Sequence, residues 1–294
     1  METEEIMDIS ERINDAAKPV NDPAGRMVKV IHEDTAIAIA ADAGFPLAAI
    51  YQTALQKGIW PFRYLRNRSS LSAIDQLRIC NSSILICGAG GLGGHVILLL
   101  ARIGAGHLHT FDPDVFDASN LNRQMLAASG VIGKSKAETA RERVAEINPA
   151  VGCTAYPRKI SLGDIKALVP QVNVVADCLD TIQDRLLLEQ WTKESGIPLV
   201  HTAVAGFEGQ IMTIFPEDSG LKRIYGDMPS PSHSNNSPES IEGTPAPGPG
   251  VMGSLQAMEV IKILIGRGDI LRHSLLHVNL LTSHFHRFNL APNN

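Results

Sequence analysis

Short apolar runs alternate with longer amphipathic segments through the middle of the chain. Residues 84–87 have the composition of a strand that is buried on both faces of a parallel sheet. The segment 92–103 continues as an apolar helix that ends at Gly104. Further strands are predicted at 107–111, 151–156, 172–177 and 198–204, with helices at 134–147 and 181–195. This order predicts an α/β fold with a Rossmann-like, doubly wound and mainly parallel sheet.

The N-terminal part of the chain departs from this alternation. Residues 1–25 are polar and predict a loosely held arm. Two short helices follow at 34–42 and 46–57, joined at Gly44. Their small residues have the spacing of a helix-turn-helix, but the second helix offers only Lys57 to DNA phosphates. A helical hairpin that packs on the main domain or on a partner is therefore favoured over a DNA-binding motif.

The C-terminal part predicts antiparallel strands and a long loop. Residues 210–215 alternate as a half-exposed strand does, a helix is expected at 253–266, and 275–289 predict a closing hairpin. The segment between them is rich in proline and glycine. The predicted organisation is an N-terminal arm and helical hairpin at 1–60 and a main domain at 61–294, which includes a mobile crossover loop at 216–250.

Composition and charge exclude several classes of protein. The chain has 294 residues, 44% of them hydrophobic, and a formal charge of −5, which suits a packed core and argues against a nucleic-acid binder. No apolar run reaches about 18 residues, and the acidic N-terminus lacks the layout of a secretory signal. The four cysteines include no C-x-x-C pair and fit reduced core thiols. We therefore expect a cytoplasmic protein without a membrane span.

A glycine-rich turn joins the first strand to its helix. Gly88, Gly90 and Gly93 match G-x-G-x-x-G, which allows a tight turn and a close approach of backbone N–H groups to an anion. The helix dipole favours phosphates at the same point. Asp112, at the tip of the second strand, is placed to bind ribose hydroxyls. By themselves these residues indicate a nucleotide site and leave NAD, FAD and ATP open.

A set of ordered motifs between residues 60 and 290 narrows the choice. They are Arg-Tyr-Leu-Arg-Asn (63–67), Gly-Ala-Gly-Gly-Leu-Gly (88–93), Asp-Pro-Asp-Val-Phe-Asp-Ala-Ser-Asn-Leu-Asn-Arg-Gln (112–124), Gly-Lys-Ser-Lys-Ala-Glu (133–138), Ile-Asn-Pro (147–149), Asp-Cys-Leu-Asp-Thr (177–181) and Gly-Ser-Leu-Gln-Ala-Met-Glu-Val-Ile-Lys (253–262). With these motifs the chain resembles the ubiquitin-activating-enzyme-like family, specifically the bacterial MoeB/ThiF/HesA adenylyltransferases. The resemblance implies an enzyme that uses ATP to convert the C-terminal Gly-Gly carboxylate of a small ubiquitin-like sulfur-carrier protein into an acyl-adenylate, for sulfur transfer in cofactor biosynthesis.

The resemblance also implies roles for individual residues. Arg123 and Lys136 match phosphate-contacting positions, and cations suit them because negative charge builds on phosphate oxygens as pyrophosphate leaves. Asp180 falls where the family holds Mg²⁺, and Arg66 falls on a finger that reaches into the other subunit of a homodimer. The nucleotide-binding residues implied by the turn and the motifs are Gly88, Gly90, Gly91, Gly93, Asp112, Asn120 and Gln124.

Two features of many relatives are missing from the sequence. Those relatives bind a structural zinc with two C-x-x-C pairs, one near 218–225 and one near the C-terminus, and neither pair is present. His284 and His286 share one strand face, but two histidines are more often surface residues than a metal site. The loop 216–250 has no cysteine that could form a thioester. We therefore expect no zinc, and a reaction that stops at the acyl-adenylate for attack by an external sulfur donor.

Two other functions share parts of this pattern. An NAD-dependent oxidoreductase would explain the glycines and Asp112, but it gives no reason for the Ser-Asn-Leu-Asn-Arg-Gln motif or for Lys136. A non-catalytic binding or regulatory protein of the same family would explain the missing cysteines. The joint presence of five implied site residues argues against that second alternative; they are Arg66, Asp112, Arg123, Lys136 and Asp180.

Overall fold

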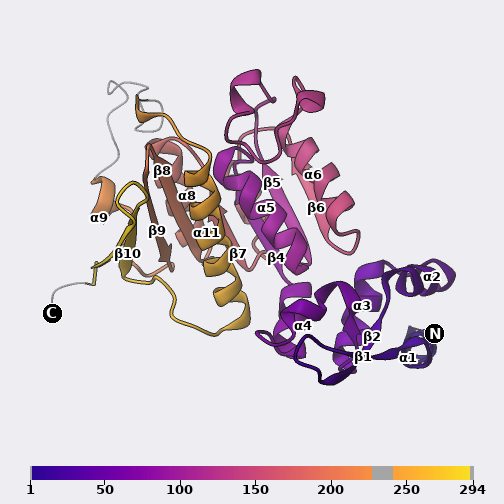
Figure 1. The fold of residues 1–294 in the computed structure, drawn as a ribbon. Helices are drawn as coiled ribbons and strands as arrows, with labels where there is room; N and C mark the ends of the chain where they lie inside the picture. The colour runs from indigo at the N-terminus through magenta and orange to yellow at the C-terminus, as the bar shows by residue number, and fades with distance from the viewer. Residues whose placement is uncertain (1, 227–240, 292–294) are drawn as a thin grey trace.

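The main body of the molecule is one eight-stranded sheet with the order β11-β10-β9-β8-β7-β4-β5-β6. The computed structural model describes residues 2–226 and 241–291, with side chains from residue 9 onwards (Figure 1). Strands β4 to β8 are parallel, and β9, β10 and β11 are antiparallel, which confirms the predicted fold class. The bounds are β4 (Ser83–Cys87), β5 (His107–Phe111), β6 (Gly152–Tyr156), β7 (Val174–Asp177), β8 (Leu199–Ala205), β9 (Glu208–Ile214), β10 (Ser274–Asn279) and β11 (His284–Asn289).

Helices cover both faces of this sheet, because its central strands are apolar on both sides (Figure 1). On one face Ile84 and Ile86 of β4 join the core of α5, α6 and α11. On the other face Leu85 and Cys87 join the core of α7 and α8. The helix bounds are α5 (Gly91–Ile103), α6 (Lys136–Ile147), α7 (Leu162–Leu168), α8 (Ile182–Glu194), α9 (Lys222–Tyr225) and α11 (Pro247–Ile265), with short 3₁₀ helices η2 (Ala118–Asn120) and η3 (Ser129–Val131).

A smaller unit with its own apolar core precedes the large sheet. It contains a three-stranded sheet with the order β1-β2-β3, in which β1 pairs with β2 antiparallel and β2 with β3 parallel. Its elements are α1 (Glu2–Ala16), β1 (Lys18–Asn21), β2 (Met27–Ile31), α2 (Glu33–Ala43), α3 (Leu47–Gln56) and β3 (Trp60–Pro61), followed by the 3₁₀ helix η1 (Phe62–Asn67) and α4 (Ala73–Cys80). The two predicted helices correspond to α2 and α3, which meet at 113° and pack into this core.

The loosely held arm expected at residues 1–25 is instead a helix and a strand pair. Ile9 and Ile13 lie one helical turn apart in α1 and are buried, so a single apolar stripe suffices to hold the helix. The turn between β1 and β2 is built on Asp22, whose Oδ1 accepts hydrogen bonds from the N–H groups of Ala24 and Arg26 at 2.9 Å. The polar composition of residues 1–25 does not indicate these elements.

Tyr64 joins the smaller unit to the large sheet. Its ring lies against Gly104, where a Cβ would lie 2.4 Å from the ring, and Gly104 has a φ of +89°. Asn148 Nδ2 donates a hydrogen bond of 2.8 Å to Tyr64 Oη and another of 2.8 Å to the carbonyl of Ala101. The packing places the unit at the end of the sheet opposite to the loops that follow β5 (Figure 1).

The predicted crossover loop at 216–250 is structured at both of its described ends. Residues 227–240, its middle part, lie outside the described residues. Helix α9 occupies the first end, and α11 begins at Pro247, earlier than the predicted position 253. Proline is tolerated in the first helical turn, where its missing N–H is not needed, so the Pro-Gly-Pro-Gly run begins the helix instead of preceding it.

In the part of the chain that the structure describes, no single helix has the length and apolar composition to cross a membrane; α2 and α3 meet that test only as a bent pair.

Candidate active site

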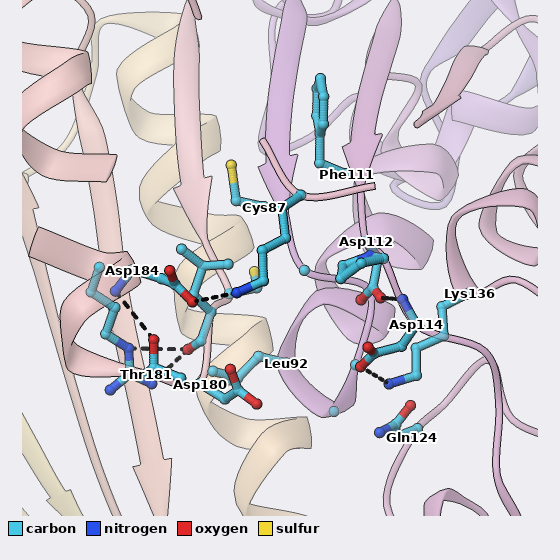
Figure 2. A pocket seen from close by; sticks show the side chains of 18 of the residues that line it. Cys87, Leu92, Phe111, Asp112, Asp114, Gln124, Lys136, Asp180, Thr181 and Asp184 are labelled. Carbon is cyan, nitrogen blue, oxygen red and sulfur yellow. Dashed lines mark hydrogen bonds and ion pairs between the residues drawn. The ribbon is translucent and has the colours of Figure 1, made fainter. Parts of the chain in front are cut away.

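A pocket of about 760 Å³ opens at the carboxyl ends of the parallel strands. Ligands bind at this edge of open α/β sheets because the loops there are free to carry functional groups. Figure 2 shows Asp112, Asp114, Gln124 and Lys136 on one side of the pocket, and Asp180, Thr181 and Asp184 across from them. Of the predicted site residues the structure brings eight to the pocket wall: Gly88, Gly90, Gly91, Asp112, Arg123, Gln124, Lys136 and Asp180.

The glycine turn depends on two close backbone approaches. Gly88 has a φ of +100°, and a Cβ there would lie 2.5 Å from the carbonyl oxygen of Cys178. A Cβ on Gly93 would lie 1.8 Å from the carbonyl oxygen of Gly88, so Gly93 packs α5 against the turn without lining the pocket. The first turn of α5 begins at Gly91, and its N–H groups have no partner within the helix. The turn can therefore bind an anion.

Asp112 is buried at the end of β5 and is held by the backbone. Its Oδ2 accepts a hydrogen bond from the N–H of Ala89 at 2.7 Å, and its Oδ1 accepts one from the N–H of Asp114 at 2.8 Å. Burial raises the pKa of the Asp112 carboxyl, and these two hydrogen bonds and the charge of Lys136 offset that rise only in part. The carboxyl group thus faces the pocket next to the glycine turn, as expected for a ribose-binding residue.

Lys136 brings a buried positive charge to the same side of the pocket. The residue is 6% exposed and begins α6, after Ser135, whose Oγ accepts a hydrogen bond from the N–H of Glu138. Its Nζ lies 3.0 Å from Oδ2 of Asp114, and the Asp114 side chain is 63% exposed. Lys136 is thus shielded from water, and the group that offsets its charge is the exposed carboxylate of Asp114.

Arg123 and Gln124 are carried by the 3₁₀ turn η2, and Asn120 builds that turn. Oδ1 of Asn120 accepts a hydrogen bond from the N–H of Asp117, and its carbonyl accepts the N–H groups of Arg123 and Gln124. Asn120 does not line the pocket. Nη1 of Arg123 bonds Ser119 and Asn122, while Oε1 of Gln124 is buried without a hydrogen-bond partner among the described residues. Asn122, Arg123 and Gln124 are the residues of this stretch that line the pocket.

Asp180 stands on the loop between β7 and α8. It is exposed, lines the pocket and makes no hydrogen bond or ion pair among the residues that the structure describes. Thr181 ends the loop by capping α8, since its Oγ1 accepts a hydrogen bond of 3.1 Å from the N–H of Asp184. Burial raises the pKa of the neighbouring Cys178 thiol well above its ordinary value, so this cysteine stays protonated.

An apolar half of the pocket was not predicted from the sequence. It is formed by Phe111, Ile160, Leu179, Leu187 and Trp191. The ring of Phe111 stacks on Tyr156 at 4.1 Å, and the guanidinium of Arg158 lies 5.2 Å above the Phe111 ring. A wall of this kind suits a flat base, and it lies next to Asp112 in the pocket. Residues 157–160 come directly after the third parallel strand, at the same sheet edge. This position is the sequence feature that could have indicated the wall.

Arg66 lies outside the pocket of its own chain. It is exposed on η1, before the helix that leads into the amino end of β4, and it makes no hydrogen bond or ion pair among the described residues. The pocket lies at the opposite, carboxyl end of that strand.

Ion pairs occupy the region where zinc-binding relatives would carry their cysteines. Nη2 of Arg272 lies 2.8 Å from Oδ1 of Asp218, and Arg272 also pairs with Glu217. His273 Nε2 lies 3.6 Å from the same oxygen of Asp218. The cluster joins the segment after β9 to the start of β10.

The pocket as a whole suits a nucleoside polyphosphate. It offers backbone N–H groups and two cations to phosphates, a carboxylate to ribose hydroxyls, and an apolar wall to a base. Asp180 adds a free carboxylate of the kind that Mg²⁺ prefers. This is the set of groups that a phosphate-transfer reaction needs.

Known proteins resemble this chain in both sequence and fold. The ThiF family matches residues 64–294. The adenylyltransferase and sulfurtransferase MOCS3 of Mus musculus is 37% identical over 222 residues, which are 75% of this chain and 48% of that protein. The molybdopterin-synthase adenylyltransferase of Escherichia coli (strain K12) is 34% identical over 220 residues, which are 72% of this chain and 85% of that protein. The chain thus spans about half the length of MOCS3.

A solved structure shows the same fold. Escherichia coli MccB in complex with AMPCPP and MccA superposes with a TM-score of 0.68 at 19% identity, over 88% of this chain and 83% of that chain. The family match covers most of the sequence, and the Escherichia coli adenylyltransferase aligns over most of its own length. The chain therefore belongs to the ThiF family.

Proposed function

We propose that this chain is an ATP-dependent adenylyltransferase that activates the C-terminal carboxylate of a small ubiquitin-like sulfur-carrier protein. The observation that carries the proposal is the pocket itself, where the glycine turn, Asp112, Arg123, Lys136 and Asp180 meet at one sheet edge. The two named relatives, which are adenylyltransferases, support it. An oxidoreductase would leave the cations and Asp180 without a role.

In the proposed reaction an oxygen of the acceptor carboxylate attacks the α-phosphorus of ATP. The new O–P bond forms as the bond between the α-phosphorus and the oxygen bridging to the β-phosphate breaks, and pyrophosphate leaves with that electron pair. Asp112 holds the ribose, and the first turn of α5 and Lys136 stabilise the phosphate charge. Arg123 can donate two hydrogen bonds to phosphate oxygens.

The described residues fit Mg²⁺ as part of the nucleotide complex. No three metal-ligating side chains gather among them, and Mg²⁺ is commonly held by one or two carboxylates together with substrate phosphates. Asp180 is the pocket carboxylate without a protein partner, so it would hold the ion. Mg²⁺ bound there would neutralise charge on the phosphates.

The acceptor tail has a route into the pocket beside the crossover segment. Val204, Gly243 and Thr244 line the pocket on that side, and the N–H of Gly206 donates a hydrogen bond of 2.8 Å to the carbonyl of Gly243. The apolar side chains of Phe207, Ile241 and Leu281 are exposed, and Phe207 follows Gly206 directly in the sequence. Exposed apolar side chains suit the docking of a folded carrier whose tail reaches inward.

Later steps of the proposed function involve other molecules. The acyl-adenylate would be attacked by an external sulfur donor, since the described thiols of Cys87 and Cys178 are buried and their pKa is raised well above the ordinary value. Arg66 would act in the pocket of the partner subunit of a homodimer, which agrees with its distance from its own pocket. Both inferences, the division at residue 60 and the cytoplasmic location stay predictions.

The likeness to MccB reaches beyond the stretch that the family match includes. The likeness to MccB in complex with MccA covers 88% of this chain, which is more than the stretch 64–294 that the family match includes. Part of the smaller N-terminal unit therefore belongs to the shared fold. MccA is present in that MccB structure, so it is included among the acceptors in the test.

The test is to incubate the chain with ATP, Mg²⁺ and a panel of carriers and MccA, and to read intact mass for an acceptor–AMP product and ATP–pyrophosphate exchange. The proposal predicts both signals with at least one acceptor, and their loss in Asp180→Asn while thermal unfolding stays unchanged. Wild-type exchange in Asp180→Asn would remove this carboxylate from the site. Binding of NAD in preference to ATP would contradict the proposed function.

A further inference from the structure

A buried chain of hydrogen bonds lies beneath the Asp180 loop, and the proposed reaction does not use it. Asp177, the last residue of β7, and His201, its register partner on β8, are both fully buried. Oδ2 of Asp177 lies 2.7 Å from Nδ1 of His201. Nε2 of His201 lies 3.1 Å from Oη of Tyr225, and the amide of Gln210 donates a hydrogen bond to the same Oη. The chain of contacts thus runs from β7 to α9.

The second oxygen of Asp177 holds the start of the Asp180 loop. Oδ1 of Asp177 accepts a hydrogen bond of 3.0 Å from the N–H of Leu179. The carbonyl of Leu179 accepts two hydrogen bonds from the guanidinium of Arg185, at 3.0 Å and 2.6 Å. Leu179 is therefore fixed through both its N–H and its carbonyl. Asp180 follows it directly.

The opposite face of the sheet holds the same strand end. Nε2 of Gln256, a fully buried residue of α11, donates to the carbonyls of Asp177 and Val200 at 2.8 Å and 3.0 Å. The thiol of Cys178 donates to Oε1 of Gln256. The backbone of β7 is thus pinned from α11, and the side chain of Asp177 is left to set the loop.

A polar pair at this depth needs a reason other than stability. Val175 and Leu199, which precede Asp177 and His201 on the same sheet face, belong to an apolar core. Apolar residues packed at such positions are often at least as stable as a buried polar pair, because burying charge costs free energy. A hydrogen-bonded pair adds direction, since it fixes which atoms meet and at what angle.

We propose that Asp177 and His201 are positioning residues that set the placement of Asp180, and that Tyr225 makes this placement depend on where α9 lies. The inference rests on the proposed function for the role of Asp180. Helix α9 is itself fixed to α8, because the N–H of Leu221 donates a hydrogen bond of 3.1 Å to Glu189. Because hydrogen bonds link Tyr225 of α9 to Asp177, a shift of α9 would change the placement of Asp180, the carboxylate that faces the nucleotide.

Three variants divide the chain of hydrogen bonds. Tyr225→Phe removes the hydroxyl and keeps the ring, which meets His201 edge-on at 5.7 Å. His201→Asn retains a donor for Asp177 and loses the contact with Tyr225. His201→Leu loses both. The matched control is Thr154→Val, which removes a hydrogen bond of 2.8 Å to His107 on the outer strands, away from the loop.

The experiment follows the fluorescence of Trp191, a pocket residue, during nucleotide binding; Trp60, the second tryptophan, is buried in the N-terminal core. We expect the affinity for ATP without Mg²⁺ to stay within about twofold of wild type in every variant. The second quantity is the Mg²⁺ concentration that gives half of the ATP-dependent fluorescence change. It should rise about tenfold in His201→Leu and about threefold in Tyr225→Phe and His201→Asn. Thr154→Val should match wild type.

Two results would overturn the inference. One is an unchanged Mg²⁺ requirement in Tyr225→Phe, which decides the matter even where His201→Leu fails to fold. The other is that the variants lose thermal stability and also lose affinity for ATP measured without Mg²⁺. A purely structural role predicts both losses together. Failure of the proposed function is a separate result: wild type would show no acceptor-dependent exchange, while the Mg²⁺ shifts would still appear in the binding measurement.

Discussion

Two charged residues of the pocket, Lys136 and Asp112, are almost completely buried. Lys136 is 6% exposed and pairs with Asp114, and Asp112 is 5% exposed and is held by backbone N–H groups. A group that is already oriented loses little freedom when a ligand binds, so its charge acts at full strength on the transition state.

Removing the charge of Lys136 should slow catalysis far more than it weakens the fold. Lys136→Met keeps the length of the side chain and should lower the rate of acceptor-dependent pyrophosphate exchange by about a hundredfold to a thousandfold. The control is Lys134→Met, two positions away, which removes an exposed lysine that does not line the pocket. Equal rates in the two variants would show that Lys136 does not act on the phosphates.

The raised pKa of Asp112 predicts an acid limb in the pH profile of nucleotide affinity, that is, a fall in affinity at low pH. In the proposed role, ionised Asp112 accepts hydrogen bonds from ribose hydroxyls, and burial raises its pKa above the ordinary 3.8. Affinity should therefore fall as the pH is lowered through that raised pKa, beginning at a higher pH than an exposed aspartate would cause. Asp112→Asn should weaken ATP binding about tenfold to a hundredfold at neutral pH and flatten this limb. Trp191 fluorescence, taken where circular dichroism shows folded protein, measures both; an unchanged limb in Asp112→Asn would contradict the assignment.

At the scale of single residues the motifs predicted most of the polar half of the pocket and none of its apolar half. Asp112, Lys136 and Asp180 follow strand ends or begin a helix, and such positions can be read from sequence. Trp191 and Leu187 reach the pocket from the middle of a helix that otherwise reads as a core helix. Their direction depends on how α8 packs, which local sequence does not specify.

Among the elements, the turn from β4 into α5 is the most tightly constrained. Gly93 and Gly94 are neighbours in α5, yet the space around them differs. A Cβ on Gly93 would lie 1.8 Å from a backbone oxygen, whereas a Cβ on Gly94 would lie 3.4 Å from Leu126. A glycine-to-alanine substitution at each of the two positions therefore separates the effect of helix propensity from the effect of close packing.

Gly93→Ala should destabilise the protein and abolish nucleotide binding, because α5 must move away from the turn. Gly94→Ala should leave ATP affinity within about twofold and change the free energy of unfolding by about +0.5 to +1 kcal/mol, since alanine favours the helix. Thermal unfolding and ATP titration of both variants give the answer. Equal stability and equal ATP affinity in the two variants would show that the turn from β4 into α5 does not require the close backbone contact at Gly93.

The pattern of apolar runs predicted the parallel strands well and the N-terminal elements poorly. A strand such as β4 is buried on both faces, so its residues read as one apolar run. β1 has a mostly exposed pattern, and α1 shows only one narrow apolar stripe, so neither gives a strong periodic signal. Both are ordered by contacts with the rest of the smaller unit, which lie far apart in sequence.

For the whole molecule, the ion-pair cluster of Asp218 and Arg272 closes the end of the sheet near the C-terminus. Oδ2 of Asp218 accepts a hydrogen bond from the N–H of Phe215, and the guanidinium of Arg272 lies 4.5 Å over the Phe215 ring. Burial by itself raises the pKa of the Asp218 carboxyl, but hydrogen bonds from Arg272 and Phe215 outweigh it, so the pKa lies below the ordinary value.

A lowered pKa in the folded state means that this carboxylate stabilises the protein above its unfolded pKa of 3.8, and that the stabilisation is lost as the pH falls through the folded pKa. Asp218→Asn should therefore lower the free energy of unfolding by about 1–3 kcal/mol at neutral pH, with the difference from wild type shrinking below the ordinary carboxyl range. The control Asp42→Asn breaks an exposed ion pair with Arg12 and should change little. Denaturant unfolding across pH measures both, and a difference that persists at low pH would contradict the assignment.

The most direct test of the account follows the atoms of the acceptor carboxylate. The acceptor found by mass analysis is labelled with oxygen-18 at its C-terminal carboxylate, incubated with the chain, ATP and Mg²⁺, and the released AMP is analysed after a sulfur or nitrogen nucleophile takes the acyl group. Attack on the α-phosphorus predicts one labelled oxygen in AMP. Label in inorganic phosphate, or unlabelled AMP beside a consumed acceptor, would contradict the central claim.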